Sequence, residues 1–541
     1  MTRGYSEYMA KAMTTMEEAP IWPADDPDPG DSRWPGRLIA IGGGRGGVGK
    51  SLIAVNLAVY LAQLGRSVVL VDADHGGSNL HCHFGLSAAS SEPDLTEGAA
   101  AMQRALVPTS IPGLSLLPAA HDAVKRPPPL RARRKAAWIA ALKTLPVNYT
   151  VIDVGSADAD SALDFMLAAD LPIAVTVPEP PAVEATYRFL RAAFLRRLRR
   201  ALVRDKLRSL LAERVVTEMR TLPAPIELIR RLANAERSLA ELAWTEAQGL
   251  RVQLVVNQTR VRADAELGGW MSGLASRHYG VALDELGHIE LDDTVSLTVR
   301  RNRPLLIDSP SSKSARNVER IARRVLALLT SKATERVASP LPTGEPTLYA
   351  VLGLTRSASD EDVRRAYKRQ REIYATGGLA TFSVLNAEEL SAAQRKLDEA
   401  YDTLLDVARR RAYDLSTFPE AEPPTLTATT THPALAAEQL LLQEQLQREI
   451  GPHTEFTGEL LRKIRESQGL ELAELSAKTR IARVYLQAIE DERFEKLPAM
   501  VYARGFVTEL AKQLHLDPVQ VQRTYLRRLR SGSTTQRREP A

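Results

Sequence analysis

The chain has 541 residues, more than one hydrophobic core usually organises, so we expect three or more domains. A single cysteine excludes a disulfide framework, and no apolar run approaches the ~18–20 residues that span a bilayer. The N-terminus lacks a secretory signal pattern, and a net charge of +5 is too small to indicate nucleic-acid binding by itself. We therefore predict a cytoplasmic protein.

Composition and periodicity divide the chain into segments. Residues 1–36 are rich in proline and acidic side chains and are predicted to be a disordered leader. In 37–330, apolar strand-like runs alternate with helical patterns, which predicts a doubly wound, mostly parallel α/β domain. We place its strands at 38–42, 67–72, 113–117, 150–153, 173–177 and 251–257. Two small all-α domains are predicted next, at 347–417 and 454–530. The ranges between and after them are a linker at 331–346, a linker with a short helix at 418–453 and a polar tail at 531–541.

A glycine-rich stretch directly follows the first predicted strand. It reads Gly44-Arg45-Gly46-Gly47-Val48-Gly49-Lys50-Ser51, and a helix-like run begins at Leu52. Strand, glycine loop and helix is the order of a phosphate-binding loop, in which backbone N–H groups and the helix N-terminus face an anion. We therefore expect residues 44–52 to bind ATP, with Lys50 reaching the outer phosphates and Ser51 binding Mg²⁺.

The same glycines permit a second interpretation. Gly42, Gly44 and Gly47 also fit the Gly-x-Gly-x-x-Gly pattern of dinucleotide-binding proteins, with Asp72 as the acid that would bind a ribose. That pattern gives Lys50 and Ser51 no role, so we favour the phosphate loop.

Two further predicted strands end in aspartate. Asp72 and Asp74 close the second strand, and Asp153 closes the fourth. Because the carboxyl ends of parallel strands face the ligand crevice, we expect Asp72 and Asp74 to lie there, one supporting the metal's water shell and one orienting an attacking water. Asp153 has the position of the second metal-binding acid of phosphate-loop ATPases.

Segment 38–330 resembles the MinD/ParA family of deviant Walker ATPases, and most closely its MinD/FlhG branch. The resemblance is carried by the glycine loop, Val71-Asp72-Ala73-Asp74 with Asn79-Leu80, Val151-Ile152-Asp153, Thr176-Val177-Pro178-Glu179-Pro180, Val255-Val256-Asn257, Leu286-Gly287-His288-Ile289 and Pro310-Ser311. It implies ATP buried between two monomers, and a homodimer that hydrolysis resets. It also implies that Ser51 binds Mg²⁺ with Asp72 and Asp153 supporting it through water, that Asp74 positions the attacking water, and that Asn257 reads adenine.

Position 45 departs from the family pattern. The family has a lysine there that reaches across the dimer to the partner's phosphates, whereas this chain has Arg45. Arginine keeps the charge, but its planar fork is larger and aimed differently. Arg45 therefore joins Lys50 and Asp74 as a candidate catalytic residue, and we expect binding and dimerisation to survive with slow or altered hydrolysis. Unchanged turnover in Arg45→Lys would contradict that hypothesis.

An expanded helical interval, about 191–249, separates two of the predicted strands. It begins within an arginine-rich helix, 188–208, in which Leu190, Phe194, Leu198 and Leu202 form one apolar stripe. We expect this stripe to pack on the ATPase core. Peripheral contact with an anionic membrane, or a protein or nucleic-acid partner, are the alternatives.

Residues 348–416 resemble a J domain, the co-chaperone module, through 348–354, 360–367, 399–404 and 409–414. The sequence Ala375-Thr376-Gly377 stands where that family has His-Pro-Asp. The resemblance therefore implies a fold kept for docking, without stimulation of a chaperone ATPase.

Residues 455–530 resemble the helix-turn-helix module of the RodZ type, through 460–466, 472–476, 485–490 and 497–506. The predicted recognition helix, about 482–491, offers Arg483 and Gln487 for base contacts. It runs into three acids, Glu490, Asp491 and Glu492, which we expect to face DNA phosphates unfavourably. We therefore favour docking to a protein over binding to DNA.

These features predict an ATP-binding switch that dimerises on ATP and positions or couples a cellular scaffold through its helical modules. The first alternative is a ParA-like DNA-associated regulator that uses the helix-turn-helix. The second is a pseudo-ATPase scaffold, in which nucleotide is a fixed structural ligand.

Overall fold

The computed structural model describes residues 36–74, 79–87, 98–119, 132–155, 160–330, 341, 346–418, 454–468, 470–479, 481–497, 500–514 and 516–535. The predicted leader and nearly all of both predicted linkers lie outside these residues. Contacts divide the chain into two compact units, one formed by Met1–Val325 with Lys332–Ala428 and the other by Leu326–Ser331 with Thr429–Ala541.

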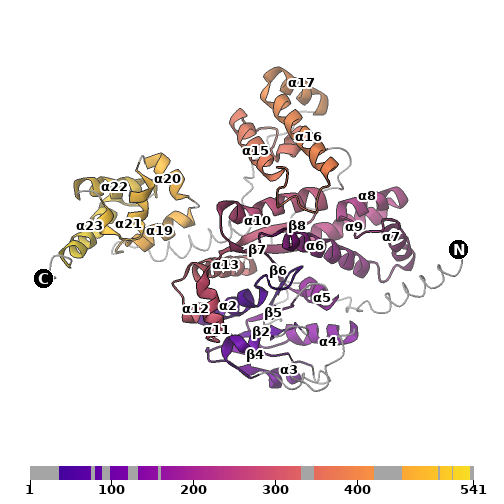
Figure 1. Ribbon diagram of the computed structural model, residues 1–541, viewed down its shortest axis with the longest axis horizontal. Coiled ribbons are helices and arrows are strands. Elements are labelled where there is room, and N and C mark those ends of the chain that lie inside the picture. Colours follow the sequence, from indigo (N-terminus) through magenta and orange to yellow (C-terminus); the bar gives the residue numbers. More distant parts are fainter. Residues whose placement is uncertain are drawn as a thin grey trace. The chain divides into compact units, whose positions relative to one another are not determined.

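The first unit is built around one sheet (Figure 1). Its strands are β1 (Arg37–Gly42), β2 (Val68–Asp72), β3 (Val107–Pro108), β4 (Leu114–Leu117), β5 (Tyr149–Asp153), β6 (Leu171–Thr176), β7 (Arg251–Thr259) and β8 (Ala282–Glu290). The order across the sheet is β3-β4-β2-β5-β1-β6-β7-β8, and each adjacent pair is parallel except β3 with β4. The predicted doubly wound, mostly parallel α/β fold is confirmed. The predicted strands are present with ends shifted by up to two residues, and β3 and β8 are strands that we did not place.

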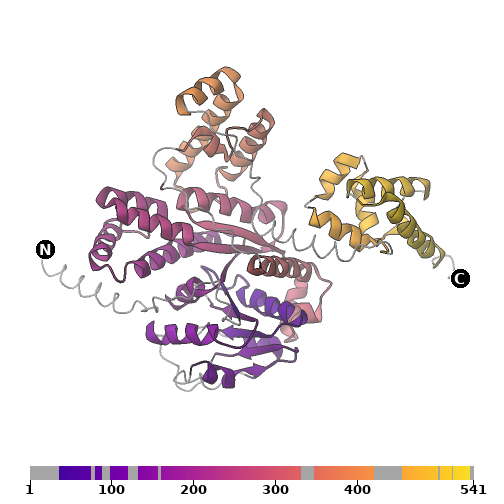
Figure 2. The same cartoon turned by 180° about the vertical axis from the view of Figure 1, so that it is seen from behind.

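Helices connect these strands and cover the sheet on both faces (Figure 1 and Figure 2). They are α2 (Lys50–Gln63), η1 (Leu80–Phe84), α3 (Ala99–Ala105), α4 (Ala132–Lys143), α5 (Asp160–Ala168), α6 (Pro180–Ala201), α7 (Lys206–Glu218), α8 (Pro225–Ala235), α9 (Arg237–Gly249), α10 (Arg262–Leu274), the π-helix η3 (Ala275–Tyr279), α11 (Asp293–Arg300), α12 (Leu305–Asp308) and α13 (Lys313–Thr330). Every residue of β2 is buried, because helices pack on both faces of the sheet there. β1 lies between β5 and β6, so the strand order reverses beside it, and the loop after β1 opens onto the crevice where such sheets bind ligands.

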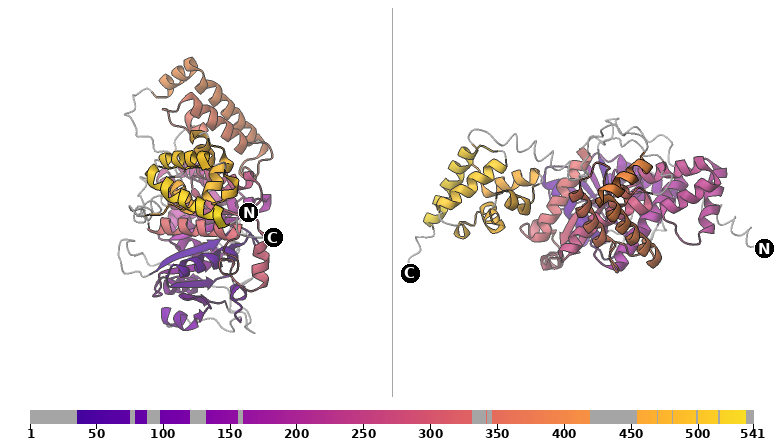
Figure 3. Two further views of the ribbon diagram at one scale, coloured as in Figure 1. Left: turned by 90° about the vertical axis from the view of Figure 1, so that its left-hand side faces the viewer. Right: turned by 90° about the horizontal axis from the view of Figure 1, so that it is seen from above.

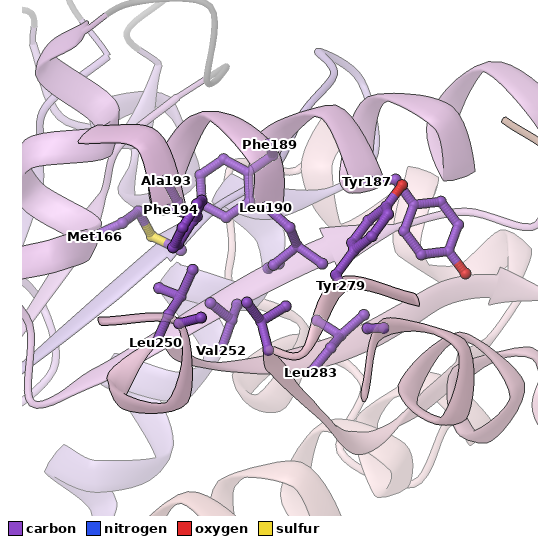
Figure 4. Close-up of a cluster of buried hydrophobic side chains, with 14 of the residues drawn as sticks. Met166, Tyr187, Phe189, Leu190, Ala193, Phe194, Leu250, Val252, Tyr279 and Leu283 are labelled. Carbon is purple, nitrogen blue, oxygen red and sulfur yellow. The ribbon is translucent and has the colours of Figure 1, made fainter. Parts of the chain in front are cut away.

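The long helix α6 and the three helices after it form the predicted insertion, with α7, α8 and α9 at one end of the first unit (Figure 3). Leu190, Phe194, Leu198 and Leu202 of the predicted stripe are each at most 1% exposed, and Figure 4 shows the first two packed with Val252 of β7. The expectation that this stripe packs on the ATPase core is confirmed, and these apolar side chains are not exposed to enter a bilayer. Among the described residues, no helix combines the length and apolar character needed to cross a membrane.

The arginines of α6 are held by acids of neighbouring helices. Asp164 of α5 is fully buried and binds Lys135, Arg196 and Arg200 at 2.6, 2.9 and 2.6 Å. Burial acts to raise the pKa of Asp164, but the hydrogen bond from Arg196 and the charge of Arg200 outweigh it and hold this pKa below its usual range. The basic face that we predicted for this helix is thus largely occupied by intramolecular ion pairs, which clamp α6 to α4 and α5.

Residues 346–418, the helical module, contain α14 (Leu348–Leu352), α15 (Asp360–Ile373), α16 (Ala387–Leu405) and α17 (Val407–Thr417). Capping boxes start two of these helices: Ser359 with Asp362 begins α15, and Asn386 with Glu389 begins α16. Buried side chains of the module, including Tyr349 and Leu397, belong to the same hydrophobic cluster as Leu190 and Val252. The module therefore packs on the sheet-containing part of the first unit with no break in the core.

The second unit contains α19 (Gly458–Ser467), α20 (Leu472–Thr479), α21 (Arg483–Glu490), η4 (Phe494–Lys496), α22 (Met500–Gln513) and α23 (Pro518–Thr535) around its own apolar core. The expectation that the acids at the end of α21 face a ligand is wrong for Glu490, which is 4% exposed and accepts hydrogen bonds from Arg465 at 2.6 and 3.0 Å. Glu492 likewise accepts from Gly458 N–H and from Arg528, each at 2.8 Å. Both acids are therefore paired with other residues of the second unit.

Candidate functional site

Glycines shape the loop between β1 and α2. Gly49 has φ 95° at the N-cap of α2, a left-handed conformation that favours glycine. At Gly44 an added Cβ would lie 2.0 Å from the carbonyl oxygen of Ala185, so the loop backbone runs directly against the backbone of α6. At Gly46 and Gly47 an added Cβ would meet no described atom within 4 Å. The loop thus presents backbone and the start of α2 to open space, as binding of an anionic phosphate requires.

Lys50 lies beneath this loop. Lys50 is the first residue of α2 and is 6% exposed. Its Nζ donates to the carbonyl oxygen of Arg45 at 2.8 Å. Burial lowers the pKa of Lys50, while the charges of Asp153 and Asp74 act in the opposite direction. The ammonium group therefore stands close to both carboxylates, as expected for a cation shared between the protein and a bound phosphate.

Asp153 provides an unsatisfied oxygen at the end of β5. Its Oδ1 accepts from Gly155 N–H at 3.2 Å, while Oδ2 is buried and has no hydrogen-bond partner among the described residues. Burial raises the pKa of Asp153, and the Ser51 hydroxyl and Gly155 N–H lower it by hydrogen bonding. Buried polar atoms usually have partners, and a carboxylate beside a hydroxyl is an oxygen donor set that suits Mg²⁺.

The two acids at the end of β2 and just after it have different positions. Asp72 is the register partner of Asp153, and its two carboxylate oxygens accept from Asp74 N–H at 3.3 Å and Leu80 N–H at 3.2 Å. Asp72 therefore holds Leu80, the first residue of η1. Asp74 lies against the backbone of Gly155, where an added Cβ would approach its carboxyl carbon to 2.5 Å. The fold thus brings Asp74 and Asp153 to the same place, as the strand-end argument predicts.

Asn257 lies under the phosphate-binding loop. Its Nδ2 donates to the carbonyl oxygen of Val48 at 2.8 Å, and its Oδ1 accepts from Gln258 N–H at 2.9 Å. With Asn257 4% exposed and both ends of its amide occupied, its clearest role is to hold the loop. Its role in reading adenine stays a prediction.

Arg45 forms an ion pair that the sequence did not reveal. Its Nη1 lies 3.0 Å from Oε2 of Glu179, and both side chains are about half exposed, at 46% and 59%. Glu179 is the N-cap residue of α6, yet its side chain makes no capping hydrogen bond and is available to Arg45. The sequence motif that contains Glu179 indicates no role for this residue, because only the fold places it opposite Arg45.

A glycine loop between a buried strand and a helix, at the reversal of a parallel sheet and beside a buried lysine and two strand-end acids, defines the first unit as a phosphate-loop nucleotide-binding protein. The CobQ/CobB/MinD/ParA nucleotide binding domain family matches residues 39–396, which is more than half of the chain, and the chain belongs to that family. This membership favours the phosphate loop over the dinucleotide interpretation of the same glycines.

Two curated proteins are similar to part of this chain. Antiactivator FleN of Pseudomonas aeruginosa is 33% identical over 162 residues, which cover 30% of this chain and 57% of that protein. The flagellum site-determining protein YlxH of Helicobacter pylori is 30% identical over 170 residues, which cover 29% of this chain and 53% of that protein. The chain spans about half the length of the curated relatives it matches.

One solved structure and one further family complete the comparison. The septum site-determining protein MinD complexed with Mg-ADP from Pyrococcus horikoshii has 20% sequence identity and a TM-score of 0.35, covering 55% of this chain and 99% of that chain. A helix-turn-helix domain family matches residues 460–521, which lie in the second unit.

Proposed function

We propose that the chain is an ATP-dependent switch that forms a homodimer when it binds Mg-ATP and separates after hydrolysis. The observation that carries this proposal is the buried, unpartnered Oδ2 of Asp153, which lies with Lys50 and Asp74 beside a loop that faces open space. A phosphate-loop site needs a cation and an acid of this kind.

The residues have distinct roles in this proposal. Lys50 and the backbone of 44–49 hold the phosphates, and Asn257 keeps the loop in shape. Ser51 and Asp153 would hold Mg²⁺, with Asp72 supporting it through water, and the ion would supply neutralisation of phosphate charge. Asp74 would accept a hydrogen bond from the attacking water.

The exposure of the loop favours a dimeric active form. Arg45 is 46% exposed in its side chain, and the described residues leave Gly46 and Gly47 uncovered. Excluding bulk water strengthens the electrostatic interactions of a phosphate site, and a second copy seated on the loop would achieve this exclusion. The named relatives are an antiactivator and a flagellum site-determining protein, so we further propose that this switch positions a cellular scaffold, with the helical modules docking protein partners.

Light scattering of the purified chain tests the switch. We expect a mass near 59.4 kDa without nucleotide and with Mg-ADP, and about twice that mass with Mg-ATP. A mass that does not change, in samples where calorimetry shows bound nucleotide, would instead support the pseudo-ATPase scaffold. Absence of nucleotide binding would reject both.

One observation in the second unit favours a second function, binding to DNA. With Glu490 buried, the exposed side of α21 presents Arg483, Val484 and Gln487 without that acid. This arrangement predicts affinity for duplex DNA that falls steeply with added salt and that drops in Arg483→Ala. Fluorescence anisotropy at two salt concentrations measures both effects. Affinity that changes neither with salt nor in Arg483→Ala would reject the DNA-binding hypothesis.

A further inference from the structure

Helix α6 contacts the phosphate-binding loop at two points near its start. The Arg45 guanidinium binds Glu179, the N-cap residue, and the backbone of Gly44 abuts the carbonyl of Ala185. No side chain separates the loop from the helix at the second contact, because glycine has none. A shift of the loop at Gly44 therefore meets helix backbone directly, and close-packed contacts of this kind transmit displacement instead of absorbing it.

Two residues after Ala185, the same helix contacts the helical module. Tyr187 is fully buried, and its hydroxyl donates to the carbonyl oxygen of Ala380 at 2.8 Å. Burial raises the pKa of Tyr187 well above its usual value, so the hydroxyl keeps the proton that it donates. Ala380 lies between α15 and α16, in the stretch 374–385 that contains Ala375-Thr376-Gly377.

The π-helix η3 holds the other end of this stretch. His278 Nε2 lies 2.9 Å from the hydroxyl of Tyr374, and Arg277 donates to that hydroxyl at 3.2 Å and to the carbonyl oxygen of Ala350 at 3.3 Å. Tyr279 of η3 packs edge-on against Tyr187, with ring centroids 5.5 Å apart (Figure 4). Tyr187 thus touches both the module and the helix that anchors it.

We propose that α6 couples the phosphate-binding loop to segment 374–385, so that the packing of the helical module depends on whether Arg45 is engaged by a nucleotide phosphate or by Glu179. The inference rests on the proposed function, because it requires the loop to bind Mg-ATP. The two partners of Arg45 are mutually exclusive, since one guanidinium cannot face Glu179 and leave it for a phosphate at the same time. Two discrete arrangements at one end of a rigid helix are what coupling between distant sites requires.

Linkage gives the proposal a second consequence. If Mg-ATP alters the packing of 374–385, then changing that packing must alter Mg-ATP affinity by the same factor. The module would then act as a reporter and regulator of the nucleotide site, and a partner that binds the module could read or set the state of the switch.

Hydrogen exchange of the full-length chain, with and without saturating Mg-ATP, tests the coupling. We expect the exchange rates of peptides within 374–385 to change by about fivefold or more in the wild type. Tyr187→Phe keeps the ring and removes only the hydrogen bond to Ala380, and it should reduce this response to near unity. Glu179→Gln weakens the surface ion pair with Arg45 and should move the nucleotide-free exchange toward the bound value.

Tyr367→Phe is the matched control, because the Tyr367 hydroxyl bonds Asp398 at 2.7 Å inside the module and does not cross to α6. It should keep the full response. Calorimetry on the same samples distinguishes failure of the coupling from failure of nucleotide binding. Mg-ATP that binds without changing exchange in 374–385 overturns the coupling and leaves the proposed function standing, whereas no binding overturns both. Equal loss of response in Tyr367→Phe and Tyr187→Phe also overturns the path through α6.

Discussion

Replacing Lys50 with alanine is expected to weaken Mg-ATP binding by about 100-fold or more. Lys50 is the buried cation of the site, close to Asp153 and Asp74. Its removal would leave the phosphates of the nucleotide facing two carboxylates without the amine that offsets them. Loss of one partner from a buried charged cluster costs roughly 2–5 kcal/mol of binding free energy, and about 1.4 kcal/mol corresponds to tenfold in affinity.

Isothermal calorimetry with Mg-ATP measures this effect, and Lys206→Ala is the control. Lys206 is exposed at the start of α7 and lies in the insertion, so its loss should leave the affinity unchanged. Wild-type affinity in folded Lys50→Ala would show that the loop does not bind phosphates through this lysine. Circular dichroism of both variants establishes that they are folded.

Gly44→Ala is expected to lower the free energy of unfolding of the first unit by about 3 kcal/mol, because the new methyl group has no room. Its Cβ would lie 2.0 Å from the Ala185 carbonyl oxygen and 2.2 Å from the carbonyl carbon. Backbone atoms cannot rotate aside as a side chain can. Either the loop or α6 must move, and nucleotide binding should be lost with the loop geometry.

Gly46→Ala provides a contrast two residues away. An added Cβ there meets no described atom within 4 Å, and Gly46 does not have a positive φ. Its unfolding free energy should stay within about 0.5 kcal/mol of the wild type. Urea unfolding of the two variants followed by circular dichroism compares them, and equal stability would contradict the close approach of the loop to α6.

The strongest sequence signals were local. Glycine spacing in 44–49, the apolar runs that became β1 and β5, and the aspartates at strand ends each lie within about ten residues of chain. Such patterns predict strand, loop and helix directly, because backbone conformation and burial on both faces depend on neighbouring residues. The nucleotide-binding fold and the meeting of Asp74 with Asp153 followed from them.

The sequence was a poor guide where charged side chains find partners far along the chain. The acids at the end of α21 were expected to repel a ligand, but Arg465, 25 residues earlier, binds Glu490 inside the core. The arginines of α6 left contact with an anionic membrane open as an alternative, but Asp164 of α5 binds two of them. A charge read along the chain shows its sign, and only packing shows whether it is already neutralised.

The sequence by itself determined the family of this protein, six of the eight strands that the structure describes in the sheet, and the glycine loop that follows β1. Only the tertiary structure decided that Arg45 pairs with Glu179, 134 residues away, and that Tyr187 bonds Ala380, 193 residues away. The physical reason is that conformational preference acts between near neighbours, whereas these contacts exist only after the sheet and α6 have brought remote segments together.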